Sequence, residues 1–161
     1  MQSTRQLVTA SVLLVSVAVP LGSPAGAAGY DFSNPSSTGC VTKGMLEVPA
    51  TARTFGAFTI RLRRSTGCNT VWALVKRTDT KKCMQSGLNC AKVRLTRVLA
   101  NGTKSATAWR KMPDGAKGVL SFQLIGLRSS AFTGTFATFG GKYLGASGTL
   151  KVDQNGTWTT S

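Results

Sequence analysis

The sequence contains no histidine, and only five of its 161 residues are acidic, against 20 lysines and arginines. Histidine is the commonest general base and the commonest metal ligand in proteins. Its absence excludes Ser-His-Asp and Cys-His catalytic arrangements, together with every zinc site that needs imidazole. The scarcity of carboxylates also argues against a calcium site, which needs several oxygen ligands close together.

Most of the few carboxylates have an evident local role. Asp114 and Asp153 lie in turn motifs, where aspartate accepts backbone hydrogen bonds, and Asp79 lies between basic residues as a counter-ion. Asp31 and Glu47 have no such role. If the protein is instead a small secreted enzyme, these two carboxylates are the candidate catalytic residues. A Ser-Lys dyad is the other possible catalytic arrangement. Nothing else points to catalysis, and we expect a protein that is not an enzyme and has no cofactor and no metal.

A long apolar run occurs once, between Leu7 and Val19 near the N-terminus. It is too short to span a bilayer, whose hydrocarbon core is about 30 Å thick. Residues 25–27, Ala-Gly-Ala, follow it and fit the small-x-small rule of a signal peptidase site. We therefore predict a signal peptide over residues 1–27 and a secreted, extracellular domain over residues 28–161, without a transmembrane segment in its mature form.

The four cysteines all follow the predicted cleavage site. An even number of cysteines in an exported chain predicts disulfides, and their spacing lacks the paired Cys-x-x-Cys units of a zinc site. Four cysteines allow three pairings. We favour Cys40 with Cys68 and Cys83 with Cys90, although the sequence leaves the connectivity open.

The mature region has the pattern of β structure throughout. No window of a dozen residues keeps the spacing of an amphipathic helix, whereas Phe-Thr-Ile-Arg-Leu-Arg at 58–63 alternates as a half-buried strand does. Further strands are expected at 41–48, 71–78, 91–100, 103–110, 119–127, 131–139, 149–152 and 157–160. About eight or nine short strands predict a single all-β domain, a small antiparallel sandwich or barrel stapled by two disulfides.

In the strand expected at 91–100, Val93 and Leu95 point inward, while Lys92 and Arg94 point outward. The alternation becomes unclear at Arg97. One extra residue in a strand moves the side chains that follow to the other face. A bulge near Arg97 is therefore one explanation of the pattern.

One run of the chain resembles a known family. Residues 62–73 read Leu-Arg-Arg-Ser-Thr-Gly-Cys-Asn-Thr-Val-Trp-Ala, similar to the Leu-Arg-Tyr-Ser-x-x-Cys-x-x-x-Trp-Ala signature of small exported actinobacterial-type domains of unknown function. Tyr30-Asp31 and Gly39-Cys40 match the motifs that usually precede it, while Arg64 stands in place of the family's tyrosine. The resemblance covers residues 30–77. It implies export, β structure and a Cys40–Cys68 bridge, and brings no activity with it.

The formal net charge is +15, and the basic residues gather between positions 61 and 97, where Asp79 is the one acid. If the strands that carry them are neighbours, like charges stand opposite one another, at a cost unless water or an anionic ligand screens them. We predict a binding face for an anionic polymer, such as a cell-wall polyanion or an acidic glycan. The predicted ligand-binding residues are Arg61, Arg63, Lys92, Arg94 and Tyr143.

Two alternatives stay open beside this binding face. The charge can serve solubility alone, with basic side chains protecting exposed strands from pairing. The loop that Cys83 and Cys90 enclose, residues 84–89, can also be rigid enough to act as a protease inhibitor or antagonistic effector.

Overall fold

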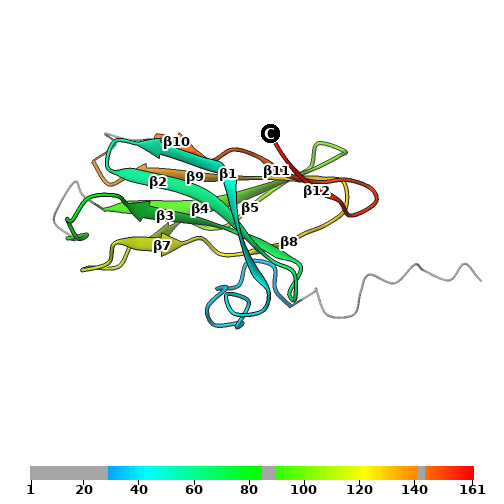
Figure 1. Ribbon diagram of the computed structural model, residues 1–161, viewed down its shortest axis with the longest axis horizontal. Coiled ribbons are helices and arrows are strands. Elements are labelled where there is room, and N and C mark those ends of the chain that lie inside the picture. The colour runs from blue at the N-terminus through cyan, green and yellow to red at the C-terminus, as the bar shows by residue number, and fades with distance from the viewer. Residues whose placement is uncertain (1–28, 85–89, 141–143) are drawn as a thin grey trace, which may run out of the picture.

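The computed structural model describes residues 29–84, 90–140 and 144–161, and these form two antiparallel sheets without a helix (Figure 1). The all-β fold class is therefore confirmed, and of the two predicted architectures the chain adopts the sandwich. The signal peptide predicted over residues 1–27 and the predicted ligand-binding residue Tyr143 lie outside the described residues.

The first sheet, sheet A, is organised around β3, which pairs with β2 on one side and with β7 and β8 on the other. Its strands are β1 (Met45–Phe55), β2 (Phe58–Ser65), β3 (Thr70–Arg77), β7 (Gly118–Leu120) and β8 (Leu124–Ile125). The strand predicted over 119–127 is thus divided. Between β7 and β8, the buried side chains of Ser121 and Gln123 accept hydrogen bonds from β3, from the Ala73 N–H and the Thr70 hydroxyl respectively.

The second sheet, sheet B, is organised around the long antiparallel pair of β4 and β9. Its strands are β4 (Ala91–Leu99), β5 (Lys104–Ala106), β6 (Arg110–Lys111), β9 (Ser130–Thr138), β10 (Leu144–Ala146), β11 (Leu150–Val152) and β12 (Trp158–Thr160). The strands expected on either side of Asn101-Gly102 form a hairpin, since β4 pairs with β5, and those on either side of residues 153–156 form another, since β11 pairs with β12.

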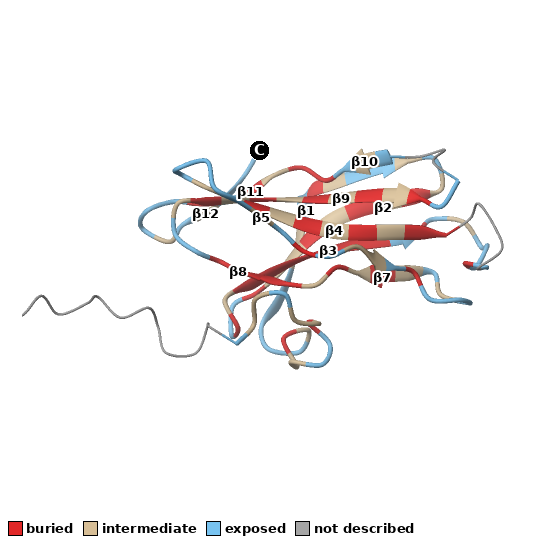
Figure 2. Ribbon diagram, turned by 180° about the vertical axis from the view of Figure 1, so that it is seen from behind, coloured by how far each residue is buried: buried red, intermediate tan, exposed pale blue. Residues whose placement is uncertain are grey.

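Buried and half-buried residues alternate along β2, β4 and β9 (Figure 2). The buried residues of the central strands form one core between the sheets, as the period-two pattern predicts. The fully buried members include Ile60, Leu62, Val71, Val75, Val93, Leu95, Phe132 and Phe136. The two sheets are in close contact at Gly134, where a Cβ atom would lie 2.6 Å from the Cβ of Ala73. Glycine at this position lets the two sheets pack.

The bulge considered near Arg97 is not formed. β4 pairs with β9 without interruption, from Ala91 opposite Thr138 to Leu99 opposite Ser130. The apolar pattern becomes unclear because the inward position is taken by a charged residue: Arg97 is 6% exposed, and its guanidinium binds the Asp31 carboxylate at 3.3 Å. An ion pair at the end of the sandwich, rather than a change of register, explains the sequence.

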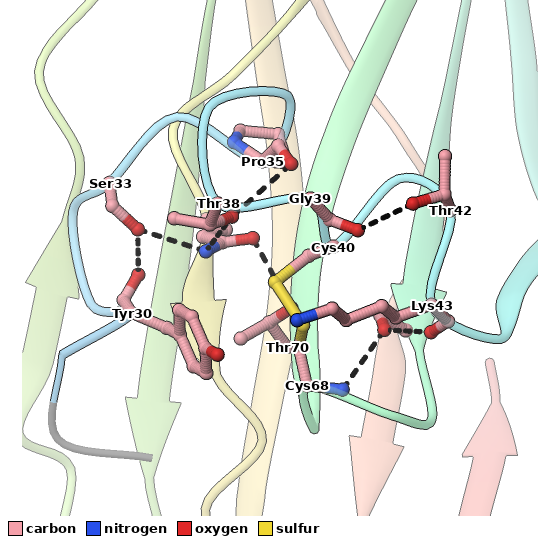
Figure 3. Close-up of a disulfide and its surroundings, with 12 residues drawn as sticks. Tyr30, Ser33, Pro35, Thr38, Gly39, Cys40, Thr42, Lys43, Cys68 and Thr70 are labelled. Atoms are coloured by element: carbon pink, nitrogen blue, oxygen red, sulfur yellow. Dashed lines mark hydrogen bonds between the residues drawn. A yellow bond between two sulfur atoms is a disulfide. The ribbon is translucent and has the colours of Figure 1, made fainter. Parts of the chain in front are cut away.

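Residues 29–44 form a cap over part of the outer face of sheet A, beside β8 and β3 in Figure 1. The strand predicted over 41–48 is therefore wrong in its first half, since β1 begins at Met45. The Cys40–Cys68 disulfide (Figure 3) joins the cap to the turn before β3. It packs with Trp72, which points outward from β3 and is fully buried. The Cys83–Cys90 disulfide is also present, so the favoured connectivity is confirmed.

Buried hydrogen bonds from Gln123 also anchor the cap. The Gln123 amide Nε2 donates to Ser33 Oγ at 2.9 Å and to Thr38 Oγ1 at 3.1 Å, and its oxygen accepts from Thr70. Gln123 is fully buried, so these partners offset the cost of removing its amide from water. The cap is therefore an integral layer of the fold.

Candidate anion-binding faces

The four cations predicted to form one binding face lie on two opposite faces of the sandwich. Arg61 and Arg63 point outward from β2 in sheet A, whereas Lys92 and Arg94 point outward from β4 in sheet B. Because the inward sides of both strands fill the same core, their outward sides point in opposite directions. The prediction of a single face is therefore wrong: we call the outer surface of sheet A face A and that of sheet B face B.

On face A, one carboxylate lies between the two predicted arginines. Glu47 on β1 is directly opposite Arg63 in the register of β1 and β2. Its carboxylate binds Arg61 Nε at 2.8 Å and pairs with Arg63 Nη2. The like-charge repulsion expected along this strand is thus relieved within the protein. Glu47, a candidate for the enzyme alternative, has the role of counter-ion here.

A shallow groove of about 370 Å³ opens on face A beside this ion pair. Its lining residues are Thr59, Arg61, Leu74, Lys76, Arg77 and Thr78. Thr59 is opposite Lys76, and Arg61 is opposite Leu74, across the β2–β3 pair. Lys76 is exposed and belongs to none of the ion pairs in the described part of the chain. The groove therefore presents unpaired positive charge.

Arg77 is at the end of the groove but has a structural role. Its guanidinium packs over the Phe58 ring at 4.9 Å and donates from Nε to Asp79 Oδ1 at 2.7 Å. These hydrogen bonds, more than the accompanying charge attraction, hold the pKa of Asp79 below its ordinary value of 3.8. The reading of Asp79 as a local counter-ion is confirmed.

This lowered pKa predicts a dependence of stability on acid. A carboxyl whose pKa is lower in the folded state stabilises the fold above its unfolded pKa, and the contribution is lost as pH falls through the folded pKa. We expect the Asp79→Asn variant to lose less of its own stability than the wild type does on acidification below about pH 4. Urea unfolding of both proteins across this pH range measures the two losses. Equal losses of the free energy of unfolding in the variant and the wild type would contradict this prediction.

On face B, an aromatic ring takes the place that a carboxylate has on face A. Lys92 Nζ lies 4.9 Å from the centroid of the Trp109 ring, and Arg94 Cζ lies 4.7 Å from it. Thr107 positions the tryptophan, because its backbone N–H donates to Leu95 O at 2.9 Å and its hydroxyl accepts from Leu95 N–H. The ring holds two cations together while leaving their charges uncompensated.

The rest of face B is a floor of small side chains with lysines at its two ends. At one end Lys111 is opposite Lys92. At the other end Lys104 and Lys151 flank Val98 and Ala131 across four paired strands. Thr96, Thr133, Thr135 and Ala137 form the floor between them. From Lys92 to Val98 the face extends about 20 Å, at about 3.4 Å per strand residue.

The positive charge of face B is largely uncompensated by the carboxylates of the described residues. The ion pairs in the described ranges involve Arg61, Arg63, Arg77 and Arg97, none of which is on this face. Asp153 borders the far end, where its carboxylate accepts the backbone N–H groups of Asn155 and Thr157. The charges of Lys92 and Arg94 thus remain available to an external anion.

The other sequence candidates are structural or lie outside the described residues. Asp31 binds Arg97 and accepts the Ile125 N–H at 2.6 Å. Residues 85–89, most of the proposed inhibitory loop, are outside the described ranges. Cys83, Cys90 and Asp114 place potential metal-ligand atoms within 4.8 Å of one another, but both sulfurs are joined in the disulfide.

Sequence reasoning missed the pairing of Trp109 with the β4 cations, because it depends on how the segment after β5 returns along β4. It also missed Lys76, although the outward alternation of Trp72 and Leu74 on β3 already places Lys76 on the same face.

Comparison of the chain with protein-family models, with curated proteins and with solved structures finds no match. The described ranges contain no helix long and apolar enough to cross a membrane. The fold and its two faces define a disulfide-stapled all-β sandwich with basic outer surfaces, and its two disulfides are consistent with an extracellular protein.

Proposed function

We propose that this protein is a secreted, non-catalytic binding protein for an anionic polymer of a cell surface, such as a cell-wall polyanion or an acidic glycan, and that face B is its primary binding surface. The observation that carries this proposal is the grouping of Lys92 and Arg94 around Trp109 without a carboxylate. Solubility by itself does not require two cations to share one aromatic ring.

Preorganisation supports face B over face A as the primary surface. Flexible cationic side chains lose rotamer freedom when they bind a ligand, and contact with a ring reduces that loss in advance. Arg61 and Arg63 are instead engaged by Glu47, so an external anion must compete with an internal one. The flat floor, about 20 Å long, also suits an extended chain better than a compact ligand.

We further propose that the chain belongs to the family of small exported domains that it resembles. The residues of the signature gather in the cap: Cys40, Cys68 and Trp72 form its small core, and Tyr30 packs against it. Asp31, next to Tyr30, binds Arg97. This placement supports reading the signature as the elements that hold the cap on the sheet.

The test of face B is binding of a labelled long-chain polyphosphate by the double variant Lys92→Gln/Arg94→Gln. Removing two cationic contacts should weaken binding at low salt by roughly tenfold or more and flatten the slope of log affinity against log salt by about 1.5. Fluorescence anisotropy at several salt concentrations measures both. Folding stability should change by less than about 0.5 kcal/mol, because both side chains are partly solvated.

A matched control removes the same charge elsewhere. Lys43 and Arg128 are exposed and belong to neither face, so Lys43→Gln/Arg128→Gln should stay close to the wild type in affinity and salt slope. In addition, polymer binding should change the tryptophan emission of the wild type but not that of Trp109→Phe. Equal loss of affinity in control and face B variants would mean that net charge alone drives binding, against the proposal.

A further inference from the structure

We infer that the protein joins two anionic polymer chains, one on each outer face of the sandwich, and so acts as a cross-linker. This inference rests on the proposed function of face B and adds the groove on face A as a second site for the same class of ligand.

The groove lies on the part of sheet A that the cap leaves open. The cap covers Trp72, and further along β3, on the same outward side, Leu74 and Lys76 line the groove. Glu47 engages Arg61 through Nε, which leaves the terminal nitrogens of the guanidinium free of ion pairs in the described structure. Arg61 and Lys76, with the hydroxyl of Thr59, can therefore bind one oxyanion together.

The surroundings of the groove strengthen its positive potential. Lys81 and Lys82 are exposed and follow shortly after Thr78 in the chain. Lys117 is also exposed, and its backbone oxygen accepts the N–H of Arg77 at 2.8 Å. The nearby Asp79 carboxylate is already bound by Arg77. An anion in the groove would meet several lysines, and the two carboxylates that contact the arginines of the groove, Glu47 and Asp79, are already held in ion pairs.

The two sites are rigidly held on opposite sides of one core. The packed inner faces of β2, β3, β4 and β9 separate them, and two stacked sheets lie about 10 Å apart. An extended chain on one face runs away from the other face, so a single stiff polymer must bend around a sheet edge to reach both. Two separate chains reach the two faces without bending, which favours cross-linking over wrapping.

The test uses two populations of beads coated with polyphosphate, one carrying a fluorescence donor and the other an acceptor. Wild-type protein should bring the populations together and raise energy transfer. The face A variant Arg61→Gln/Lys76→Gln should still be captured by single beads through face B but should lower cross-linking by about tenfold or more, since the gain from a second contact is lost. The single variant Lys76→Glu keeps the Arg61–Glu47 pair and should act in the same direction if the double variant does not fold.

Each outcome separates this inference from the proposed function. Loss of bead capture in Lys92→Gln/Arg94→Gln, with retention in Lys43→Gln/Arg128→Gln, supports face B; unchanged capture in the face B variant refutes the proposed function.

Wild-type capture without energy transfer means that one chain wraps the protein, and it overturns cross-linking alone. Energy transfer by the face A variants at the wild-type level also overturns it. So does light scattering that shows a dimer of the free protein at the assay concentration, because a dimer could join chains through face B alone.

Discussion

Replacing Asp31 with alanine is expected to lower the free energy of unfolding by about 3–5 kcal/mol. Arg97 is 6% exposed, and its guanidinium has the Asp31 carboxylate and the Ile125 carbonyl as partners. Removing the carboxylate leaves a positive charge buried without compensation, and it also leaves the Ile125 N–H without its acceptor. Urea unfolding followed by circular dichroism measures the change.

Two further variants isolate the cause of this loss. Asp114→Ala removes an exposed carboxylate that has no ion pair in the described structure, and should change stability by less than about 0.5 kcal/mol. Asp31→Ala/Arg97→Met removes both charges, and should recover part of the loss since no unpaired charge remains buried. If Asp31→Ala unfolds at the wild-type urea concentration, the pair does not hold the N-terminal segment on the sandwich.

Replacing Cys40 and Cys68 together with serine is expected to cost roughly 2–5 kcal/mol of stability. The bridge spans 28 residues of sequence, and removing it frees the unfolded chain from a loop of that length. It also releases the cap from Trp72, which the disulfide and its neighbours now bury completely. Besides the lower unfolding midpoint, the tryptophan emission of the folded variant should shift to longer wavelength as Trp72 meets water.

The second disulfide gives a matched comparison. The Cys83→Ser/Cys90→Ser variant removes a bridge between cysteines only seven positions apart in the sequence. Its loss of stability should therefore be smaller than that of the Cys40→Ser/Cys68→Ser variant. Its folded-state tryptophan emission should stay as in the wild type, because these cysteines belong to the main core and not to the cap. An emission shift in this variant, or none in the first, would contradict the assignment of Cys40–Cys68 to the cap.

Strand periodicity was a reliable guide wherever one side of a strand faces the core. The alternation at 58–63 and at 92–95 correctly gave the inward and outward sides of β2 and β4. It was less useful for Trp72, whose outward side is covered by another layer of the same chain. It was ambiguous at Arg97, because a buried ion pair breaks the apolar pattern in the way that a bulge does.

The sequence by itself determined that the four predicted cations of β2 and β4 point outward, since side chains of a strand alternate between its two faces. The favoured pairing of the four cysteines is likewise the one that the fold contains. The tertiary structure decided which cations act together, because strand order depends on pairings between distant segments that local pattern does not encode. It placed β2 and β4 in different sheets, gave Glu47 to Arg61 and Arg63, and brought Trp109 to Lys92 and Arg94. One predicted basic surface thereby became two, facing opposite ways from a shared core.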